Sequence, residues 1–217
     1  KQTLHASGAM PLNEARCTFV DAAPSGAVAW AQSPLARDPA RRAGGFYPAP
    51  REHAGLDPAL WDLIADRSLT AAEKTALADP STAFCTVYDP AGWHIYIETD
   101  PRGGRIDLFF STSMSQIHPL HLRFSMHHGM EGARGDVRGY RIETAKLAEG
   151  LGAAIFIPWE SLYNRLPFLE GHEGPWGFTI MRRSESGSLT WGGAEREPGR
   201  WGRLAWQPPT EAQRLAI

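Results

Sequence analysis

From residue 83 onward, hydrophobic and polar side chains alternate along the chain, and this period of two is typical of β-strands. Short turns such as "DPAG" at 89–92 and "PRGG" at 101–104 separate the alternating segments. We expect strands at 83–89, 92–100, 105–112, 120–127, 137–144, 153–159, 176–184, 188–193 and 201–206. This pattern predicts an all-β fold, an antiparallel β-sandwich, with short helical pieces at 144–150 and 159–166.

The stretch "HLRFSMHH" at 121–128 shows the alternation clearly. Its apolar positions are expected in the core, and its polar positions on the opposite face of the strand. The expected core residues are Leu122, Phe124 and Met126. The expected polar face carries His121, Arg123 and His127. This face is either a ligand platform or the solvent-exposed side of a sandwich, and the pattern does not choose between them.

The chain before residue 54 has a different character. Residues 21–57 are rich in Ala, Pro, Arg and Gly and show little periodicity, which predicts irregular structure, although Trp30, Phe46 and Tyr47 indicate that it is packed. Helical signals follow over 57–79, where Asp57 precedes Pro58 at a helix start. We therefore predict an irregular and helical N-terminal extension (1–53) packed on a β-sandwich domain (54–217).

Composition excludes several classes of partner. The 217 residues include 42% hydrophobic and 21% charged residues, which is ordinary for a globular protein. The net charge of −2 gives no electrostatic footprint for nucleic acid, so no nucleic-acid partner is expected. No apolar run reaches the length that spans a bilayer, so no membrane partner is expected either.

Two cysteines, Cys17 and Cys85, lie in apolar alternating stretches. They form either a disulfide, in an oxidising compartment, or two buried thiols. Histidine spacing disfavours a metal site, because His121 and His127 lie about 20 Å apart along an extended strand. Calcium bound by Asp side chains and backbone oxygens remains possible.

Other polar positions on the predicted strands form a candidate ligand surface. In "WHIYIETD", His94, Tyr96 and Glu98 share one side of the strand. Arg141 and Arg182 lie on two later strands. If the strands at 92–100 and 120–127 belong to one sheet, their His, Tyr, Arg and Glu side chains lie within reach of one ligand. The alternative is again a solvated outer face.

Several short motifs occur in the order found in a known family. The C-terminal ones are "GAAIFIPWESL" at 152–162, "WGFTIMRR" at 176–183, "LTW" at 189–191 and "PGRWGRLAW" at 198–206. Upstream are "TVYDPAGWHIYIETD" at 86–100 and "GLDPALWD" at 55–62. Together they resemble family 9 carbohydrate-binding modules and their DOMON-like relatives over roughly residues 54–206. One departure is "RIDLFFS", which has Asp107 but lacks the Glu that the family carries there.

The resemblance implies non-catalytic saccharide binding by one module of a larger, secreted or periplasmic, polysaccharide-active protein, although the sequence shows no signal peptide. Calcium is a possible cofactor, and neighbouring domains are expected partners. The tryptophans of the motifs are expected to be core residues: Trp159, Trp176, Trp191 and Trp201. Candidates for stacking on sugar rings are Trp30, Tyr47, Trp61 and Tyr96. Arg123 and Arg182 are expected to favour acidic saccharides.

Two alternatives remain open. One is an enzyme on the same fold that acts on a uronic-acid polysaccharide, either as a lyase or as a glycosidase with two carboxylates among Glu98, Asp107 and Glu143. The other is a haem-binding DOMON domain, for which Met114 and Met126 are available as axial ligands. No GxSxG, Walker A or HExxH motif is present.

Overall fold

The computed structural model describes residues 14–49, 72, 76–111, 120–134, 138–162, 176–185, 187–193 and 201–211. The strands are β1 (Glu14–Phe19), β2 (Tyr47–Pro48), β3 (Ala83–Tyr88), β4 (Gly92–Thr99), β5 (Arg105–Ser111), β6 (Leu120–Ser125), β7 (Gly129–Arg134), β8 (Arg141–Lys146), β9 (Leu151–Pro158), β10 (Trp176–Ser184), β11 (Gly187–Trp191) and β12 (Gly202–Gln207). The helices are α1 (Ala27–Gln32), α2 (Pro34–Arg37) and the 3₁₀ turn η1 (Trp159–Leu162). The predicted β-sandwich is confirmed.

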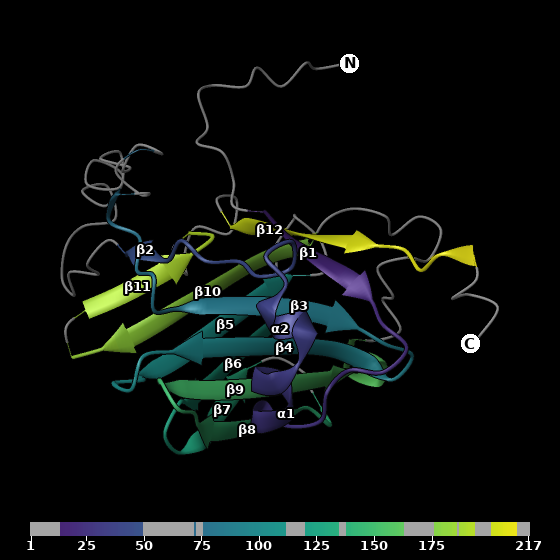
Figure 1. Ribbon diagram of the computed structural model, residues 1–217, viewed down its shortest axis with the longest axis horizontal. Coiled ribbons are helices and arrows are strands. Elements are labelled where there is room, and N and C mark those ends of the chain that lie inside the picture. Colours follow the sequence, from purple (N-terminus) through teal and green to yellow (C-terminus); the bar gives the residue numbers. More distant parts are fainter. Residues whose placement is uncertain are drawn as a thin grey trace.

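The strands follow one another in the order β7-β6-β5-β10-β12-β1-β3-β4-β9-β8, and this array folds over into two facing layers (Figure 1). The expectation of a purely antiparallel sheet is wrong, because β1 runs parallel to both of its neighbours, β12 and β3. Parallel neighbours require a long crossover connection. Here the chain between β1 and β3 includes α1 and α2, so the N-terminal segment supplies that crossover.

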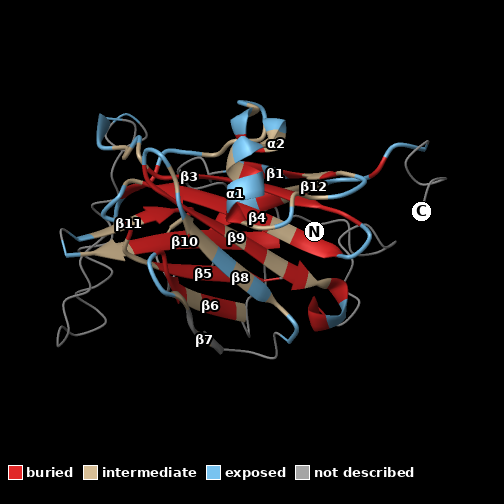
Figure 2. Cartoon of the chain, turned by 60° about the horizontal axis from the view of Figure 1, so that its bottom comes forward, coloured by how far each residue is buried: buried red, intermediate tan, exposed pale blue. Residues whose placement is uncertain are grey.

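The N-terminal segment is part of the sheet. Strand β1 lies between β12 and β3, and β2 pairs with β11. The predicted boundary at residue 53 therefore divides strands that belong to one hydrogen-bonded array. Between these strands, α1 and α2 cover the outer face of the layer that contains β3, β4 and β9 (Figures 1 and 2).

The core lies between the two layers and is rich in aromatic side chains. Trp93 of β4 meets Phe110 of β5 and Phe178 of β10, with ring centroids 5.2 and 5.6 Å apart. Edge-to-face pairs of this kind contribute about 0.5–1.5 kcal/mol beyond the area that they bury. The residues predicted to be core are all buried, which confirms those predictions: Leu122, Phe124, Met126, Trp159, Trp176, Trp191 and Trp201.

Three local predictions need correction or lie beyond the described part. The helix expected over 144–150 is wrong, because β8 extends to Lys146 and the chain then turns into β9. The helix expected at 159–166 is described only as the 3₁₀ turn η1. Most of the predicted helix 57–79, including Trp61, lies outside the described residues. No helix in the described part has the length and hydropathy that crossing a bilayer would need.

Candidate functional site

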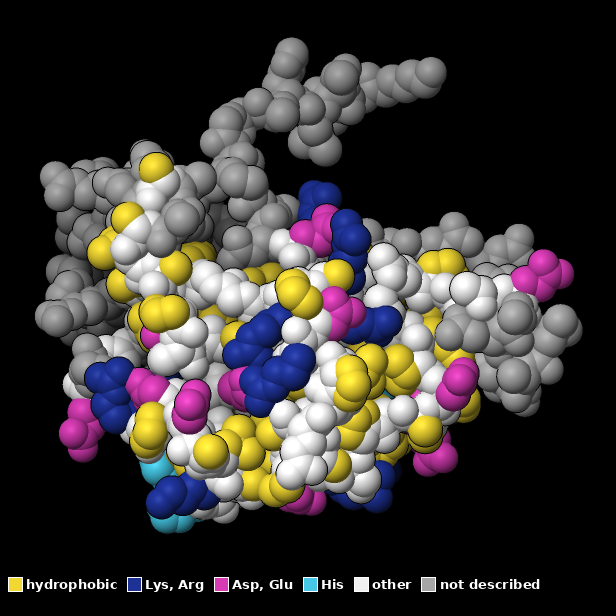
Figure 3. All heavy atoms as spheres, in the orientation of Figure 1, with side chains coloured by type: hydrophobic (Ala, Val, Ile, Leu, Met, Phe, Trp, Pro, Cys, Tyr) yellow, Lys and Arg dark blue, Asp and Glu magenta, His cyan; other side chains and the backbone are white. Residues whose placement is uncertain are grey.

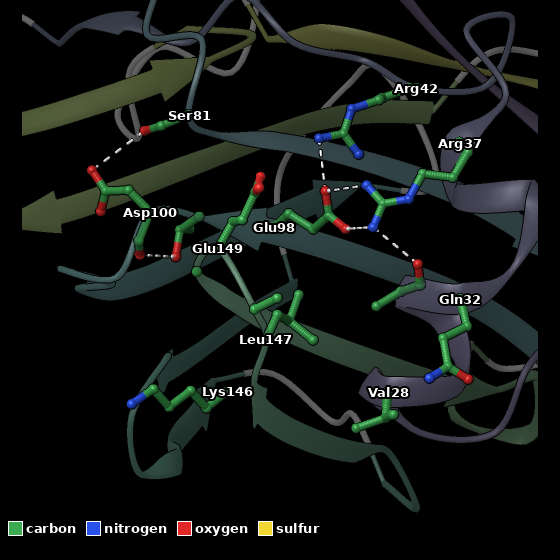
Figure 4. A pocket seen from close by; sticks show the side chains of 14 residues that line it. Val28, Gln32, Arg37, Arg42, Ser81, Glu98, Asp100, Lys146, Leu147 and Glu149 are labelled. Carbon is green, nitrogen blue, oxygen red and sulfur yellow. Dashed lines mark hydrogen bonds and ion pairs between the residues drawn. The ribbon is translucent and has the colours of Figure 1, made fainter.

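A pocket of about 640 Å³ opens on the outer face of the sandwich, between the N-terminal helices, the end of β4 and the β8–β9 turn (Figure 4). The β8–β9 turn is closed by a hydrogen bond from the Leu147 N–H to the Gly150 carbonyl (2.9 Å). The pocket is lined by Val28, Ala31, Gln32, Arg37, Arg42, Ser81, Glu98, Thr99, Asp100, Lys146, Leu147, Ala148, Glu149 and Gly150. Most of these side chains are charged, polar or small, and none is aromatic.

Helix α1 divides its faces between the sheet and the pocket. Ala27 and Trp30 are buried against the sheet, and Trp30 stacks on Tyr96 of β4 with ring centroids 5.6 Å apart and an interplanar angle of 6°. Val28 and Gln32, one helical turn apart, line the pocket. The burial of the large Trp30 ring therefore fixes which side chains of α1 reach the pocket.

The start of α1 lies against the side chain of Glu143. Gly26, which precedes the helix, has a φ of +81°, a conformation that favours glycine. A Cβ at this position would lie 2.5 Å from Glu143 of β8. The Glu143 carboxylate accepts a hydrogen bond from the Ala27 N–H at 3.2 Å. Glycine is thus required for α1 to begin against the edge strand.

Glu98, at the end of β4, is the centre of a charged cluster on the pocket wall. Arg37 and Arg42 approach its carboxylate at 3.1 and 2.8 Å. The buried Tyr96 hydroxyl donates to the same carboxylate at 2.9 Å. With a further bond from Arg37 Nη1, four donors occupy the roughly four acceptor sites of the carboxylate. Burial, and then the charge of Glu98, raises the pKa of the Tyr96 hydroxyl.

Asp100 lies on the other side of the pocket and is held from beneath by Arg182. This buried guanidinium, on the inner face of β10, donates to Asp100 Oδ1 at 2.5 Å, to Thr82 Oγ1 at 2.7 Å and to the Gly103 carbonyl at 2.6 Å. Burial of Asp100 opposes ionisation, but hydrogen bonds from Arg102 and Arg182 outweigh it and lower the pKa of the carboxyl. Asp100 and Arg182 are therefore already paired within the protein.

Three pocket side chains are available to a ligand. Within the described part of the chain, no hydrogen bond or ion pair engages the side chains of Gln32, Lys146 and Glu149. Arg37 and Arg42 add charge, because two guanidiniums share the single carboxylate of Glu98. In the space-filling view, basic and acidic side chains gather over this region, with hydrophobic side chains beside them (Figure 3). Such a wall can form several hydrogen bonds to a hydroxylated or anionic small molecule.

The predicted polar surface is split between two layers. Strands β4 and β6 are separated in the sheet order by β5, β10, β12, β1 and β3, so their polar faces do not form one surface. On β6, His121 and Arg123 both bind Asp107 of β5, at 2.8 and 2.6 Å, and Arg183 of β10 binds the same carboxylate at 2.8 Å. We call Asp107, His121, Arg123 and Arg183 the "Asp107 cluster". It pairs two residues of the polar face of "HLRFSMHH", His121 and Arg123, within the protein.

Burial of Asp107, whose side chain is 0% exposed, opposes ionisation. Hydrogen bonds from His121, Arg123 and Arg183 outweigh this effect and hold the pKa of the carboxyl well below its usual range. Arg105, on the same strand, approaches it at 3.9 Å. The cluster thus ties β6 and β10 to β5 across the outer face of the second layer.

The other candidate residues lie apart from the pocket. His94 approaches Asp89 at 2.9 Å, and both His94 and Arg141 lie against the ring of Phe156. His127, in the β6–β7 turn, is exposed and contacts the Arg102 carbonyl at 3.1 Å. Tyr47 is buried in β2. Of the predicted site residues that the structure describes, only Glu98 lines the pocket, with Tyr96, Trp30 and Arg182 supporting it from behind.

The possible disulfide is not formed. Cys17 and Cys85 are free thiols, and they point to opposite faces of the sheet. Cys17 pairs in register with Thr86 of β3, and its thiol contacts the Thr86 hydroxyl in the inner core. Cys85 precedes Thr86 on the same strand, so its side chain points to the other face and packs under α1 and α2. The described residues also offer no side-chain cluster for the calcium ion considered above. They contain no group of three or more His, Cys, Asp or Glu side chains that could hold a metal.

Sequence reasoning missed most of the pocket, including Arg37, Arg42 and Lys146. Arg37, Arg41 and Arg42 form a run of basic residues in a segment without periodicity, and this run was the available signal. Its partner, Glu98, lies 61 residues from Arg37. No spacing rule connects residues that far apart.

Comparison with solved structures identifies proteins of similar fold. One is a family 9 carbohydrate-binding module from Caldicellulosiruptor kristjanssonii in complex with cellotriose (TM-score 0.55, 11% identity, covering 92% of this chain and 96% of that one). A family 9 module from the same organism, in complex with glucose, gives a TM-score of 0.54 at 11% identity, with 92% of this chain and 98% of that one covered. A protein from Bacteroides uniformis gives 0.52 at 11% identity, with 90% and 100% covered. This likeness shows a shared fold. No protein-family model and no curated protein matches the sequence.

Proposed function

We propose that this protein is a non-catalytic saccharide-binding domain whose site is the pocket beside Glu98. One observation carries the proposal: a concave site of about 640 Å³ is lined by hydrogen-bonding side chains, several of which have no partner in the described part of the chain. Sites for small molecules are typically concave, with a few polar groups that fix orientation. The fold likeness to modules crystallised with cellotriose and glucose supports the same class of ligand.

Binding in this pocket relies on hydrogen bonds and charge. Of the candidate stacking residues, Trp30, Tyr47 and Tyr96 are buried, and Trp61 lies outside the described part. The pocket lining contains no aromatic side chain. The outward N–H groups of Arg37 and Arg42, the Lys146 ammonium and the Gln32 amide are the donors that would meet a sugar.

We assign the expected preference for acidic saccharides to this set of donors. Arg123 and Arg182, from which the preference was inferred, are paired with Asp107 and with Asp100. By contrast, Arg37 and Arg42 together carry one more charge than Glu98. Lys146 and Glu149 balance each other, and the charge of Asp100, the third acidic side chain of the lining, is balanced by Arg182 behind the pocket. A uronate carboxylate would complement the remaining positive charge, since Arg binds carboxylates in a fork geometry.

The carboxylates named for the catalytic alternative are held by partners within the protein. Asp107 belongs to the other layer, Glu98 is bound by Arg37, Arg42 and Tyr96, and Glu143 accepts a hydrogen bond from the Ala27 N–H. The Tyr96 hydroxyl, a candidate base for a lyase, donates to Glu98 beneath α1. For the haem alternative, Met126 is buried in the core and Met114 lies outside the described residues.

The wider context is proposed from the resemblance alone. We expect the domain to act outside the cytoplasm, secreted or periplasmic, beside other domains of a polysaccharide-active protein. Bound calcium also remains a proposal. A Soret band in the absorbance spectrum of the purified protein would establish a DOMON-type haem site. Stoichiometric calcium in an elemental analysis would establish a calcium site.

The proposal is tested by affinity gel electrophoresis and calorimetry with polygalacturonate and with the same polymer after methyl esterification. We expect tighter binding to the free acid. Arg37→Gln should weaken it about tenfold, as expected for a lost charge-assisted hydrogen bond, whereas the exposed Arg203→Gln, in β12, should not change it. Failure to bind any glycan of a broad panel would overturn the proposal, and new unsaturated uronates or reducing ends would overturn its non-catalytic part.

A further inference from the structure

The pocket has a second wall of different chemistry. Aliphatic side chains line part of the space: Val28 and Ala31 from α1, and Leu147 and Ala148 from the β8–β9 turn. In the close-up, Leu147 and Val28 lie on the side of the pocket away from Arg42 and Arg37 (Figure 4). The pocket therefore presents aliphatic side chains away from the two arginines, with Lys146 and Gln32 beside them (Figure 4).

Val28 is unusual for its exposure. Among the described residues, the exposed large hydrophobic side chains are Val28 (48%) and Leu77 (50%), and only Val28 lines the pocket. Isolated surface hydrophobes need no explanation, but Val28 adjoins Ala31 on the same helical face and faces a cavity that Leu147 also lines. The three form a small aliphatic patch inside a polar site, which we call the "aliphatic wall": Val28, Ala31 and Leu147.

An aliphatic wall favours different sugar ligands from those that an aromatic wall favours. A flat aromatic ring binds the face of a pyranose, whereas branched aliphatic side chains offer a small recess that suits a methyl group. A ligand that fits both walls must carry an anionic or hydroxylated edge and a methyl-bearing edge. Unsubstituted neutral glucans have hydroxyls on every edge and would leave the aliphatic wall uncovered.

We infer that the pocket recognises uronic acid residues that carry a methyl substituent, as an O-methyl ether or an O-acetyl ester, with the carboxylate toward Arg37 and Arg42 and the methyl group against Val28 and Leu147. This inference rests on the proposed function. Burial of one methyl group contributes an amount that corresponds to about a fourfold gain in affinity. The methyl group thus sharpens selectivity among acidic saccharides, while the carboxylate supplies most of the affinity.

The test compares matched oligosaccharides by calorimetry: glucuronate-bearing oligosaccharides with and without a 4-O-methyl group, and acetylated oligogalacturonates with and without alkaline deacetylation. We expect the native protein to bind at least one substituted form about fourfold more tightly than its unsubstituted partner. Val28→Thr keeps the shape of the side chain but replaces a methyl group with a hydroxyl. It should reduce this ratio, taken between the variant's own affinities for the two forms, to about one.

Leu77→Thr is the matched control, since it changes the other exposed aliphatic side chain outside the pocket and should preserve the ratio. Equal affinities of the native protein for all substituted and unsubstituted partners would overturn the inference and leave the proposed acidic-saccharide function standing. Retention of the ratio in Val28→Thr would also overturn it. Absence of binding to every oligosaccharide, at low ionic strength, would overturn both.

Discussion

The two layers of the sandwich each carry a carboxylate on the outer face that is held by arginines, yet the two arrangements differ in where the arginines come from. Asp107 takes its partners from β6 and β10, the strands on either side of it. Glu98 takes Arg37 and Arg42 from α2 and the residues after it, which belong to the N-terminal segment. Asp107 is fully buried, whereas the Glu98 side chain is 12% exposed and borders a pocket.

This difference separates a structural cluster from a candidate site. Neighbouring strands bring the members of the Asp107 cluster together as soon as the sheet forms, so the cluster strengthens the sheet. Glu98 instead anchors a separate segment of the chain, and the space left between that segment and the β8–β9 turn is the pocket. Pairs of carboxylate and guanidinium therefore hold strands together in one layer and border the candidate binding pocket in the other.

The largest effect should follow from Asp107→Asn, which keeps the size of the side chain but removes the charge that three cations share. Breaking a buried ion pair from one side costs about 3–5 kcal/mol, and we expect the free energy of unfolding to fall by that amount. Urea denaturation followed by tryptophan fluorescence measures it. A loss below about 1 kcal/mol would contradict the structural role and remove the contrast between the two clusters.

Lowering the pH should reveal the contribution of the Asp107 cluster to stability. The folded-state pKa of Asp107 is lowered relative to the unfolded chain, so its contribution is complete above the unfolded value of about 4 and is lost as the pH falls toward the folded value. The lowered pKa values of Asp79, Asp89 and Asp100 act in the same direction. Urea melts at pH 5, 4 and 3 should show stability falling with pH, with a smaller decline in Asp107→Asn. Equal declines in both proteins would refute the assignment.

Glu98→Gln should have a smaller and more local effect. Its guanidinium partners are partly exposed, so we expect a loss of about 1–2 kcal/mol, less than for Asp107→Asn. The loss should concentrate in the N-terminal segment, because Arg37 and Arg42 would no longer be anchored to β4. Hydrogen exchange should report faster exchange over 27–42 and little change in β5, β6 and β10. Uniformly faster exchange would show that Glu98, like Asp107, supports the whole sheet.

How much of this could be read from the sequence differs between the two clusters. Alternation located most strands and identified Leu122, Phe124 and Met126 as core, because period two follows directly from strand geometry. It also placed His121 and Arg123 on one face. It could not show that Asp107 would lie opposite Arg123, since register depends on the turn and on the facing strand, and residues 112–119 gave no register signal.

The pocket was harder to predict because it forms between segments that carry no common pattern. Strand β1 was not predicted although Cys17 lies in an alternating stretch, because six such residues ahead of an aperiodic segment do not establish a strand by themselves. Strand β7, "GMEGAR", contains glycines, which are unfavourable in strands. Val28 and Arg37 lie on helices of only 6 and 4 residues, too short for helical periodicity to be visible. Only the tertiary fold joins them to Glu98.

Lys146→Gln should give a smaller effect that concerns the ligand alone. Lys146 is exposed, so its removal should leave stability unchanged within about 0.5 kcal/mol. Binding of an acidic oligosaccharide should weaken about threefold in 50 mM salt, and less at higher ionic strength, because exposed charges are screened. Arg203→Gln provides the control for net charge. Equal weakening by the two variants would indicate that overall charge, rather than the pocket, attracts the ligand.

The smallest expected effect concerns the cysteines. A disulfide between β1 and β3 would stabilise the layer that carries Glu98 by about 2–4 kcal/mol. A difference in stability between the two layers would then reflect a covalent bond as well as the ion pairs of Glu98 and Asp107. Because Cys17 and Cys85 are free and point to opposite faces, dithiothreitol should shift the urea midpoint by nothing measurable. Burial raises the pKa of the Cys85 thiol to about 12, so both thiols should react with iodoacetamide only after unfolding. A midpoint that falls on reduction would show that the native sheet is cross-linked.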